Sequence, residues 1–239
     1  MATAVNERSS AVAGMASEWP MLEALMKGTS AMRRAGRSFL PKFPKEDEGS
    51  YEARLGASTL FPAFQRTVTA MAGKPFAKAL TLSDETPVEI RGVQGKPAMG
   101  DKPAVASQEG WADNIDRQGV NLHTFAAEMI EEALAYGIAG IVVDAPRAIA
   151  PAGRVPTRAE EAAAGVRPYF VRVKHNQIIG WRAVNVGGAW VLTQLRLMEC
   201  VTEDDGDFGT KEIEQVRVLV PGGWATYRES ERAGPDGKK

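Results

Sequence analysis

Apolar residues recur at helical spacing most clearly between Leu122 and Tyr136. They follow the i, i+3, i+4, i+7 rhythm of a broad stripe on one helix face, and glutamates take the opposite face. Asn121 precedes the stripe and is a natural N-cap, and Gly137 ends it. The pattern predicts a helix over residues 122–136 that buries its apolar face.

Two weaker helical patterns come earlier in the chain. The first starts at Pro20, which suits a first helical turn because proline lacks an N–H, and fades at Gly36. The second leads from Tyr51 to Gly73 with an interruption at Pro62. The segment 74–103 is rich in proline and glycine and predicts loops, with one short strand near Val88–Ile90.

Beyond the main helix the pattern changes to strands. Residues 138–144 predict a buried strand, and Thr157 with Glu160 has the spacing of a capping box for a short helix closed by Gly165. Apolar and β-branched runs then alternate with turn residues and predict further strands; the runs are 169–173, 178–186, 190–201, 212–220 and 224–228. The last four predict an antiparallel meander, with a hairpin at Gly187-Gly188 and an acidic turn at 203–207.

These elements predict an α+β fold, with N-terminal helices packed against a mainly antiparallel C-terminal sheet. Residues 1–18 are expected to form a flexible arm and residues 230–239 a disordered tail. The single domain between them, residues 19–229, is expected to be helical over 19–136 and to hold the strands over 138–229.

Composition and charge narrow the function. The 239 residues carry 29 basic and 30 acidic side chains, so the basic excess of a protein that grips DNA phosphates over its whole surface is missing. Cys200 is the one cysteine, which excludes an intrachain disulfide. The N-terminus lacks the apolar run of a signal peptide, and the most apolar stretch, 138–143, is far below the ~20 residues of a membrane span. We therefore expect a cytoplasmic protein that is not secreted.

Catalytic and metal motifs do not emerge from the sequence. His123 and His175 are the two histidines, and for both we expect a surface or capping role. The turn at 203–207 breaks the ligand alternation of a calcium loop, and one cysteine with two distant histidines does not make a zinc site. Gly73-Lys74 is followed by proline and is not a phosphate-binding loop, while the glycines at 137 and 140 follow a helix and are not a dinucleotide motif. We therefore predict no catalytic residues, no metal and no cofactor.

Two residue groups leave a functional alternative open. Asp144 and Glu199, with the 203–207 cluster, would be the carboxylates of a metal-dependent nuclease if they converged in a cleft. The one local basic cluster is either a solvated face or an electrostatic contact to a neighbouring subunit or nucleic acid; its members are Lys27, Arg33, Arg34 and Arg37.

Specific segments, in order and spacing, carry a resemblance over roughly residues 19–229. They are 26–28, 32–36 and 39–41, then Tyr51-Glu52-Ala53-Arg54-Leu55, 114–119 leading into Leu122, Tyr136 to Pro146, Arg167-Pro168-Tyr169, 178–182 and 215–219. In these segments the chain resembles the portal-like proteins of tailed phages and prophages.

The resemblance implies a structural subunit of a ring at one capsid vertex, through which DNA is packaged into the capsid and later ejected. It implies self-association into that ring in the full-length protein, contact with capsid or scaffold proteins, DNA as passing cargo without tight binding, and no membrane. It also implies a location in the virion and in the bacterial host cytoplasm. Portals do not themselves hydrolyse anything.

The chain departs from the family at its C-terminal side. Family members continue into tunnel-lining helices and a clip that meets the terminase and tail adaptors, and those contacts therefore do not carry over. What is present resembles the outer wing, either as an expression fragment or as a truncated prophage gene, and for this chain alone we expect weak or no assembly. The alternatives are a self-contained phage or prophage adaptor module and, less favoured, the nuclease.

Overall fold

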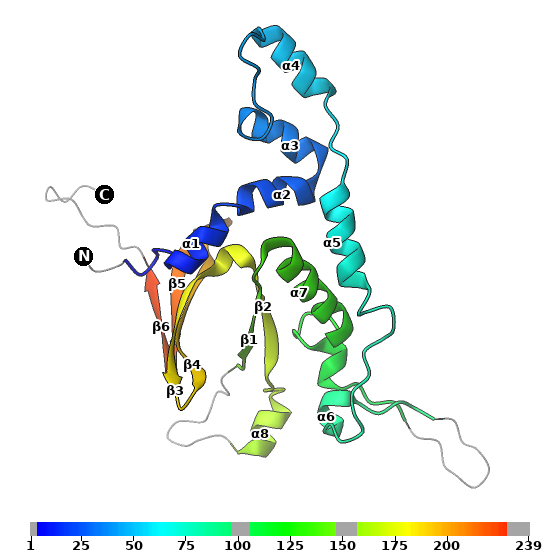
Figure 1. The fold of residues 1–239 in the computed structure, drawn as a ribbon. Coiled ribbons are helices and arrows are strands. Elements are labelled where there is room, and N and C mark those ends of the chain that lie inside the picture. The colour runs from blue at the N-terminus through cyan, green and yellow to red at the C-terminus, as the bar shows by residue number, and fades with distance from the viewer. Residues whose placement is uncertain (1–3, 97–105, 147–156, 229–239) are drawn as a thin grey trace, which may run out of the picture. The chain divides into compact units, whose positions relative to one another are not determined.

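A computed structural model describes the chain over residues 4–96, 106–146 and 157–228. Its helices lie in the N-terminal part and its four-stranded antiparallel sheet in the C-terminal part, which confirms the α+β class (Figure 1). The tail predicted for residues 230–239 lies outside the described residues.

The chain forms two compact units, where the sequence predicts one domain over 19–229. Unit 1 consists of residues 1–23 and 174–239, and unit 2 consists of residues 24–173. Unit 1 is therefore discontinuous, and unit 2 is inserted into it. Unit 1 has a core of its own, which the sheet builds with the N-terminal segment.

The sheet of unit 1 is the predicted four-stranded meander. Its strands are β3 (Ile178–Val186), β4 (Ala189–Asp205), β5 (Gly209–Val220) and β6 (Gly223–Arg228), in the order β3-β4-β5-β6. Gly187 and Gly188 both have positive φ angles, 59° and 90°, as the predicted tight hairpin requires.

Residues 4–18 differ from the predicted flexible arm. Ser10–Ala16 forms helix α1, which Ser9 caps by accepting a hydrogen bond from the backbone N–H of Val12. The backbone N–H of Ser9 donates to the carbonyl of Ile179 at 2.9 Å, and Val12 is fully buried. An arm prediction from small residues fails here because the helix gains its stability from contact with β3 rather than from its own sequence.

The core of the sheet lies on the face that carries this N-terminal segment. Ile179, Val216 and Val218 are buried there, and Val5 and Met198 pack against them. At Gly180 a side chain would collide with Ser9, since a Cβ atom would stand 2.8 Å from the Cβ of Ser9. Gly180 thus lets the N-terminal segment approach the sheet closely.

Unit 2 is mainly helical. The first predicted helix is divided by Gly28 (φ 81°) into α2 (Trp19–Lys27), whose first five residues belong to unit 1, and α3 (Thr29–Ala35). The helices that follow include the short helix η1 (Gly36–Ser38), α4 (Glu48–Ala57), α5 (Ala63–Gly73), η2 (Trp111–Asn114) and α7 (Leu122–Tyr136).

Helix α7 has the predicted bounds and organises the core of unit 2. Ile115, Phe125 and Met129 are buried together, with Phe170 packed against them. Helix α5 lies along α7, where the hydroxyl of Thr69 donates to Glu131 at 2.8 Å. The amphipathic stripe of α7 is therefore the element around which unit 2 is built.

Two predicted strands differ in the structure. Residues 88–90 belong to a short helix, α6 (Val88–Arg91), because Pro87 and Gly92 bracket the segment with conformations that suit helix ends. Strand β1 (Gly140–Asp144) forms as predicted, but it is not buried, since Ile141 and Val143 are 49% and 62% exposed.

Strand β1 does not join the four-stranded sheet in the described part of the chain. It pairs with β2 (Tyr169–Val173) as a separate antiparallel ribbon of unit 2. Its β-branched residues favour extended backbone whether they are buried or exposed. The apolar run therefore indicates a strand but does not indicate that the strand is buried. The short helix α8 (Arg158–Ala163) starts after Thr157, whose backbone N–H donates to Glu160 at 2.8 Å in the predicted capping box.

Candidate functional site

The two histidines have structural surroundings of different kinds. His123 accepts a hydrogen bond at Nδ1 from the backbone N–H of Leu80, at 3.2 Å, and thereby holds a loop to the start of α7. Its ring meets the ring of Phe76 edge-on, with centroids 5.4 Å apart. Its proton therefore resides on Nε2 when the ring is neutral.

His175 is buried, so the surface role expected for it is wrong. It is 5% exposed in the short helix η3 (His175–Gln177). Its ring lies edge-on to Trp19, with centroids 4.8 Å apart, and its Nε2 is 3.5 Å from the Oε1 of Glu23. The η3 turn directs the ring inward, and His175 thus ties the start of β3 to α2 within unit 1.

Glu199, one carboxylate of the nuclease alternative, is part of an ion-pair network on the sheet. Its Oε1 lies 2.9 Å from the Nε of Arg217, and its Oε2 accepts a hydrogen bond from the amide of Gln215 at 3.0 Å. Arg228 extends the network, because it donates to Gln215 at 2.9 Å and lies 2.5 Å from Glu203. A carboxylate engaged on both oxygens is a poor metal ligand.

Asp144, the other carboxylate, stands at the end of β1 and accepts a hydrogen bond from the backbone N–H of Ala145 at 2.8 Å. It belongs to unit 2, whereas Glu199 belongs to unit 1. Within the described ranges, no three His, Cys, Asp or Glu side chains gather as a group that could hold a metal ion.

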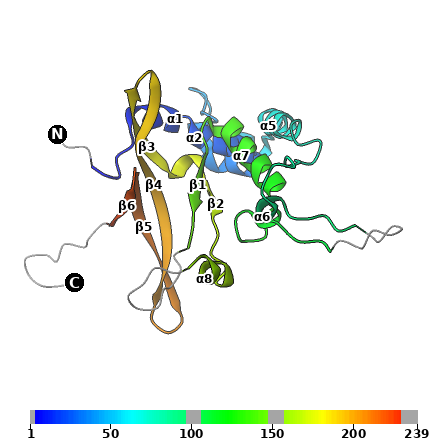
Figure 2. The same ribbon diagram turned by 90° about the horizontal axis from the view of Figure 1, so that it is seen from below.

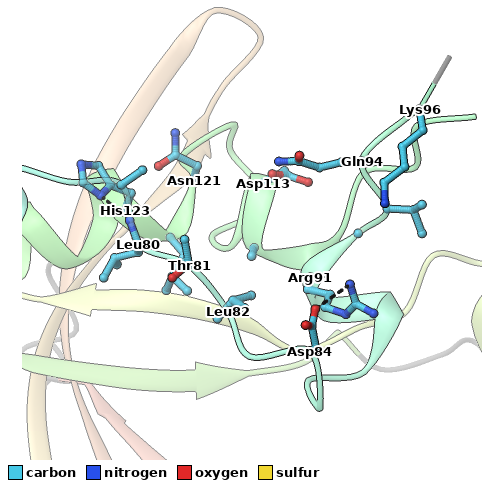
Figure 3. Close-up of a pocket in the computed structure, with 15 residues that line it drawn as sticks. Leu80, Thr81, Leu82, Asp84, Arg91, Gln94, Lys96, Asp113, Asn121 and His123 are labelled. Atoms are coloured by element: carbon cyan, nitrogen blue, oxygen red, sulfur yellow. Dashed lines mark hydrogen bonds and ion pairs between the residues drawn. The ribbon is translucent and has the colours of Figure 1, made fainter.

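A cavity of about 770 Å³ opens in unit 2 (Figure 3). It lies between the 79–84 loop, the segment after α6, η2 and the start of α7. Several of its polar groups hold backbone in place: Asp113 accepts from the N–H of Gly110 at 2.8 Å, and Asn121 caps α7 by accepting from Thr124 at 2.9 Å. Arg91 donates to the carbonyl of Thr86 at 3.1 Å.

A close crossing of two glycines supports one wall of this cavity. A Cβ atom on Gly110 would stand 2.2 Å from the backbone nitrogen of Gly92, and one on Gly92 would stand 2.5 Å from the carbonyl oxygen of Gln108. Val93 and Gln108 exchange two backbone hydrogen bonds beside the crossing, at 2.7 and 2.9 Å. The polar lining of the cavity therefore serves mainly to build these loops.

The predicted basic cluster is exposed and partly engaged within unit 2. Arg33 donates from Nε to the carbonyl of Ser58 at 2.9 Å, which satisfies a carbonyl just beyond α4. Arg37 forms an ion pair with Glu48, and its guanidinium lies 5.4 Å from the centre of the Tyr51 ring. Arg34 and Lys27 are also exposed. The structure thus places all four residues on helix surfaces around α3 and gives Arg33 and Arg37 an intramolecular role.

An apolar row crosses the whole sheet of unit 1. Directly opposed residues in antiparallel strands share a face, and the register opposes Trp181 to Leu195, Leu195 to Leu219, and Leu219 to Trp224. Trp181 is 39% exposed and Trp224 is 56% exposed. The spacing of these residues in the sequence gives no sign of the row, because only the register of four strands brings them together.

The row continues along the β3–β4 hairpin. Residues two apart on β3 share a face, so Ala183 and Asn185 follow Trp181, and their partners on β4 are Leu192 and Trp190. Leu192 is 50% exposed and Trp190 is 75% exposed. We call the face carrying this row and the hairpin residues the tryptophan face. A contiguous exposed apolar surface is typical of interaction sites and of ligand-binding grooves.

Comparison with protein-family models and with curated proteins found no match to the chain. No helix among the described residues combines the length and apolar character needed to cross a membrane.

Proposed function

We propose that this protein is a structural subunit of a phage portal ring, namely the wing portion, and acts by assembly rather than by catalysis. The observation that carries an assembling role is the tryptophan face of the sheet, which spans four strands and exposes large apolar side chains. Tryptophan is enriched where protein interfaces bind most strongly. The resemblance to portal-like proteins then narrows the assembly to a ring at the capsid vertex.

The way the resembling segments meet in unit 2 supports this proposal. Arg167, from the 167–169 segment, donates to the carbonyl of Asn114, the first residue of the 114–119 segment. The backbone N–H of Phe170 donates to the carbonyl of Ile115 at 3.0 Å. Segments that resemble the family therefore make contacts that build the fold. This favours an architecture shared with the portal-like proteins.

A second pair of resembling segments meets around α4. The hydroxyl of Tyr51 donates to the carbonyl of Leu40 at 3.1 Å, and Arg54 donates to the carbonyl of Pro41 at 3.0 Å. The 51–55 and 39–41 segments thus interlock, again through side chains that are part of the resemblance.

The proposed partners are those that a subunit of a portal ring would contact. They are further copies of the full-length protein, capsid or scaffold proteins, and DNA as cargo in passage. The terminase and tail adaptors would meet a part of the subunit beyond this wing. The near-neutral charge, with 29 basic and 30 acidic side chains, agrees with a conduit that does not hold DNA tightly.

A self-contained adaptor module is the second candidate, and the same tryptophan face favours it. The nuclease is disfavoured, because Glu199 is engaged by Arg217 and Gln215. The two assembling functions differ in what the rest of the gene encodes and in the size of the product.

The test is to read the source genome beyond the Lys239 codon and to measure the mass of the product of the whole reading frame by native mass spectrometry. The portal proposal expects long amphipathic helices downstream and a large closed oligomer. A matched pair of variants then probes the face: Trp181→Ser with Trp224→Ser should reduce assembly, whereas Val186→Ser, at the exposed hairpin end, should leave it intact. A monomeric product followed by an unrelated gene would overturn the portal proposal in favour of the adaptor.

A further inference from the structure

A two-stranded arm extends from the sheet of unit 1. Strand β3 pairs with β4 only as far as Leu197, and β6 pairs with β5 only as far as Gln215. Beyond these points β4 and β5 pair only with each other, as far as the Asp205–Gly209 pair. Figure 2 shows this hairpin, coloured orange, projecting beyond β6. We call residues 198–214 the ribbon arm.

The tip of the ribbon arm presents an aromatic side chain that the turn itself does not need. Gly206 has a φ of 73°, and at Gly209 a Cβ would stand 2.4 Å from the carbonyl oxygen of Asp205, so the glycines are required by the turn geometry. Phe208 lies between them and is fully exposed, at 102%. A phenylalanine held in water at the end of a projecting hairpin has the position and chemistry of an interface anchor.

The ribbon arm around this anchor is acidic. Residues 203–214 hold six acidic side chains and one basic side chain. Glu203 is held by Arg228, and the strand pairing places Glu212, Glu214 and Asp204 on one face of the arm. The pKa of the Cys200 thiol on this face is raised, because the thiol is partly desolvated and faces Glu212 and Glu214.

The chain itself carries a surface of opposite charge. Residues 24–45 hold six basic side chains and no acidic one, and this basic segment includes the cluster predicted from the sequence. Arg37 and Lys42 are paired with Glu48, but Arg34 and Lys45 are exposed. Phe43 in the same segment is 61% exposed, so the basic segment also offers apolar surface to an incoming aromatic ring.

We infer that the ribbon arm of one copy, anchored by Phe208, docks on the basic segment of a second copy. The inference deepens the proposed function and rests on it, since it names the contact between neighbouring subunits. The two surfaces are different, so the contact is head-to-tail, and a pair of copies keeps one free arm and one free basic segment. Repetition of such a contact closes into a ring when the rotation between copies permits.

The test separates the two halves of the contact into two variants of the full chain. A donor keeps the ribbon arm and carries Arg34→Glu with Lys45→Glu, and an acceptor keeps the basic segment and carries Asp204→Lys, Asp207→Lys and Phe208→Ser. Neither variant alters Arg33, Arg37 or Glu203, whose intramolecular contacts support the fold. Circular dichroism checks that both are folded.

Sedimentation velocity at about 100 μM chain gives the readout. Each variant alone should associate less than the parent chain, and the mixture should regain association through a 1:1 complex that dissociates as ionic strength rises, because exposed charges are screened. Adding Phe208→Ser to the donor should weaken the complex at least tenfold, in the range of an anchor residue. A chain that carries both charge reversals but retains Phe208 should self-associate again.

Two results would overturn the inference: a mixture that stays monomeric, or single variants that associate as well as the parent chain. Its failure is distinct from that of the proposed function. If the whole gene product still forms rings when it carries both sets of substitutions, the inferred arm contact is wrong and the portal proposal is unaffected. A whole gene product that never assembles would remove the portal proposal.

Discussion

Glu46 is a carboxylate that the fold holds firmly in its charged form. Both of its carboxylate oxygens accept hydrogen bonds from Arg54, each at 2.8 Å, and the backbone N–H of Phe43 donates to it at 3.0 Å. The guanidinium of Arg54 also stacks on the ring of Phe43, 4.5 Å from its centre. These contacts lower the pKa of Glu46 to about 2, with the Arg54 hydrogen bonds as the main cause.

Replacing Arg54 with alanine should raise the pKa of Glu46 towards the ordinary value of about 4.3. A lowered pKa stabilises the fold at every pH above the unfolded value, and that contribution disappears as pH falls from about 4 towards 2. Carbon-detected NMR titration of the Glu46 carboxyl reports the midpoint directly. Arg33→Ala serves as a control, since Arg33 contacts a carbonyl rather than Glu46. An unchanged midpoint in Arg54→Ala would assign the shift to another group.

At the scale of elements, the crossing of Gly92 and Gly110 is a tight steric constraint in unit 2. Gly110→Ala would place a methyl group 2.2 Å from the backbone nitrogen of Gly92, and backbone cannot yield as a flexible side chain can. The substitution should lower the free energy of unfolding by about 3 kcal/mol, at the upper end of overpacking effects. Urea denaturation followed by circular dichroism measures the change.

Gly56→Ala is the matched control for this prediction. Gly56 lies in α4, and a Cβ there meets nothing within 4 Å. Alanine should therefore raise stability by about 0.5–1 kcal/mol through helix propensity. Equal effects of the two substitutions would contradict the crossing as the structure describes it.

Elements whose signals are local could be predicted from the sequence. Helix α7 has the predicted bounds because the cap at Asn121, the apolar stripe and the left-handed Gly137 all act within one segment. Helix α1 is not predicted because five of its seven residues are Ser, Ala or Gly, and the contact that stabilises it lies with Ile179, far along the chain. Propensity cannot report a contact of that range.

The candidate surfaces also differ in whether the sequence signal that reveals them is local or depends on strand pairing. The basic cluster is visible in the sequence because its members are neighbours there. The tryptophan face is not visible, since Trp181 and Trp224 come together through three successive strand registers. The pairing of Glu199 with Arg217 also depends on the way adjacent strands are aligned, so the sequence left the nuclease alternative open.

At the scale of the whole molecule, unit 2 is an insertion in unit 1. The two chain crossings between the units, at residues 23–24 and 173–174, start from neighbouring points of unit 1, because Glu23 and His175 lie 3.5 Å apart at their side-chain ends. An engineered linker of about six residues, which spans up to about 20 Å, should therefore be long enough to join Glu23 to Lys174.

Unit 1 with such a Gly-Ser linker in place of residues 24–173 should fold alone. The expected result is slow amide exchange in β3–β6 and an intact Trp19 contact, measured by NMR. Val12→Asp in the same shortened chain should abolish this protection, since Val12 is fully buried. Lack of protection in the shortened chain without that substitution would mean that unit 2 is required for unit 1 to fold.

The inserted arrangement also sets the order in which the protein can fold during synthesis. Helix α1 leaves the ribosome before unit 2, but strand β3, which it contacts, is made only after the whole of residues 24–173. At roughly 5–20 residues per second, translation of that stretch lasts about 8 to 30 s. Unit 2 therefore has time to fold before the sheet of unit 1 exists, and helix α1 is made early but buried late.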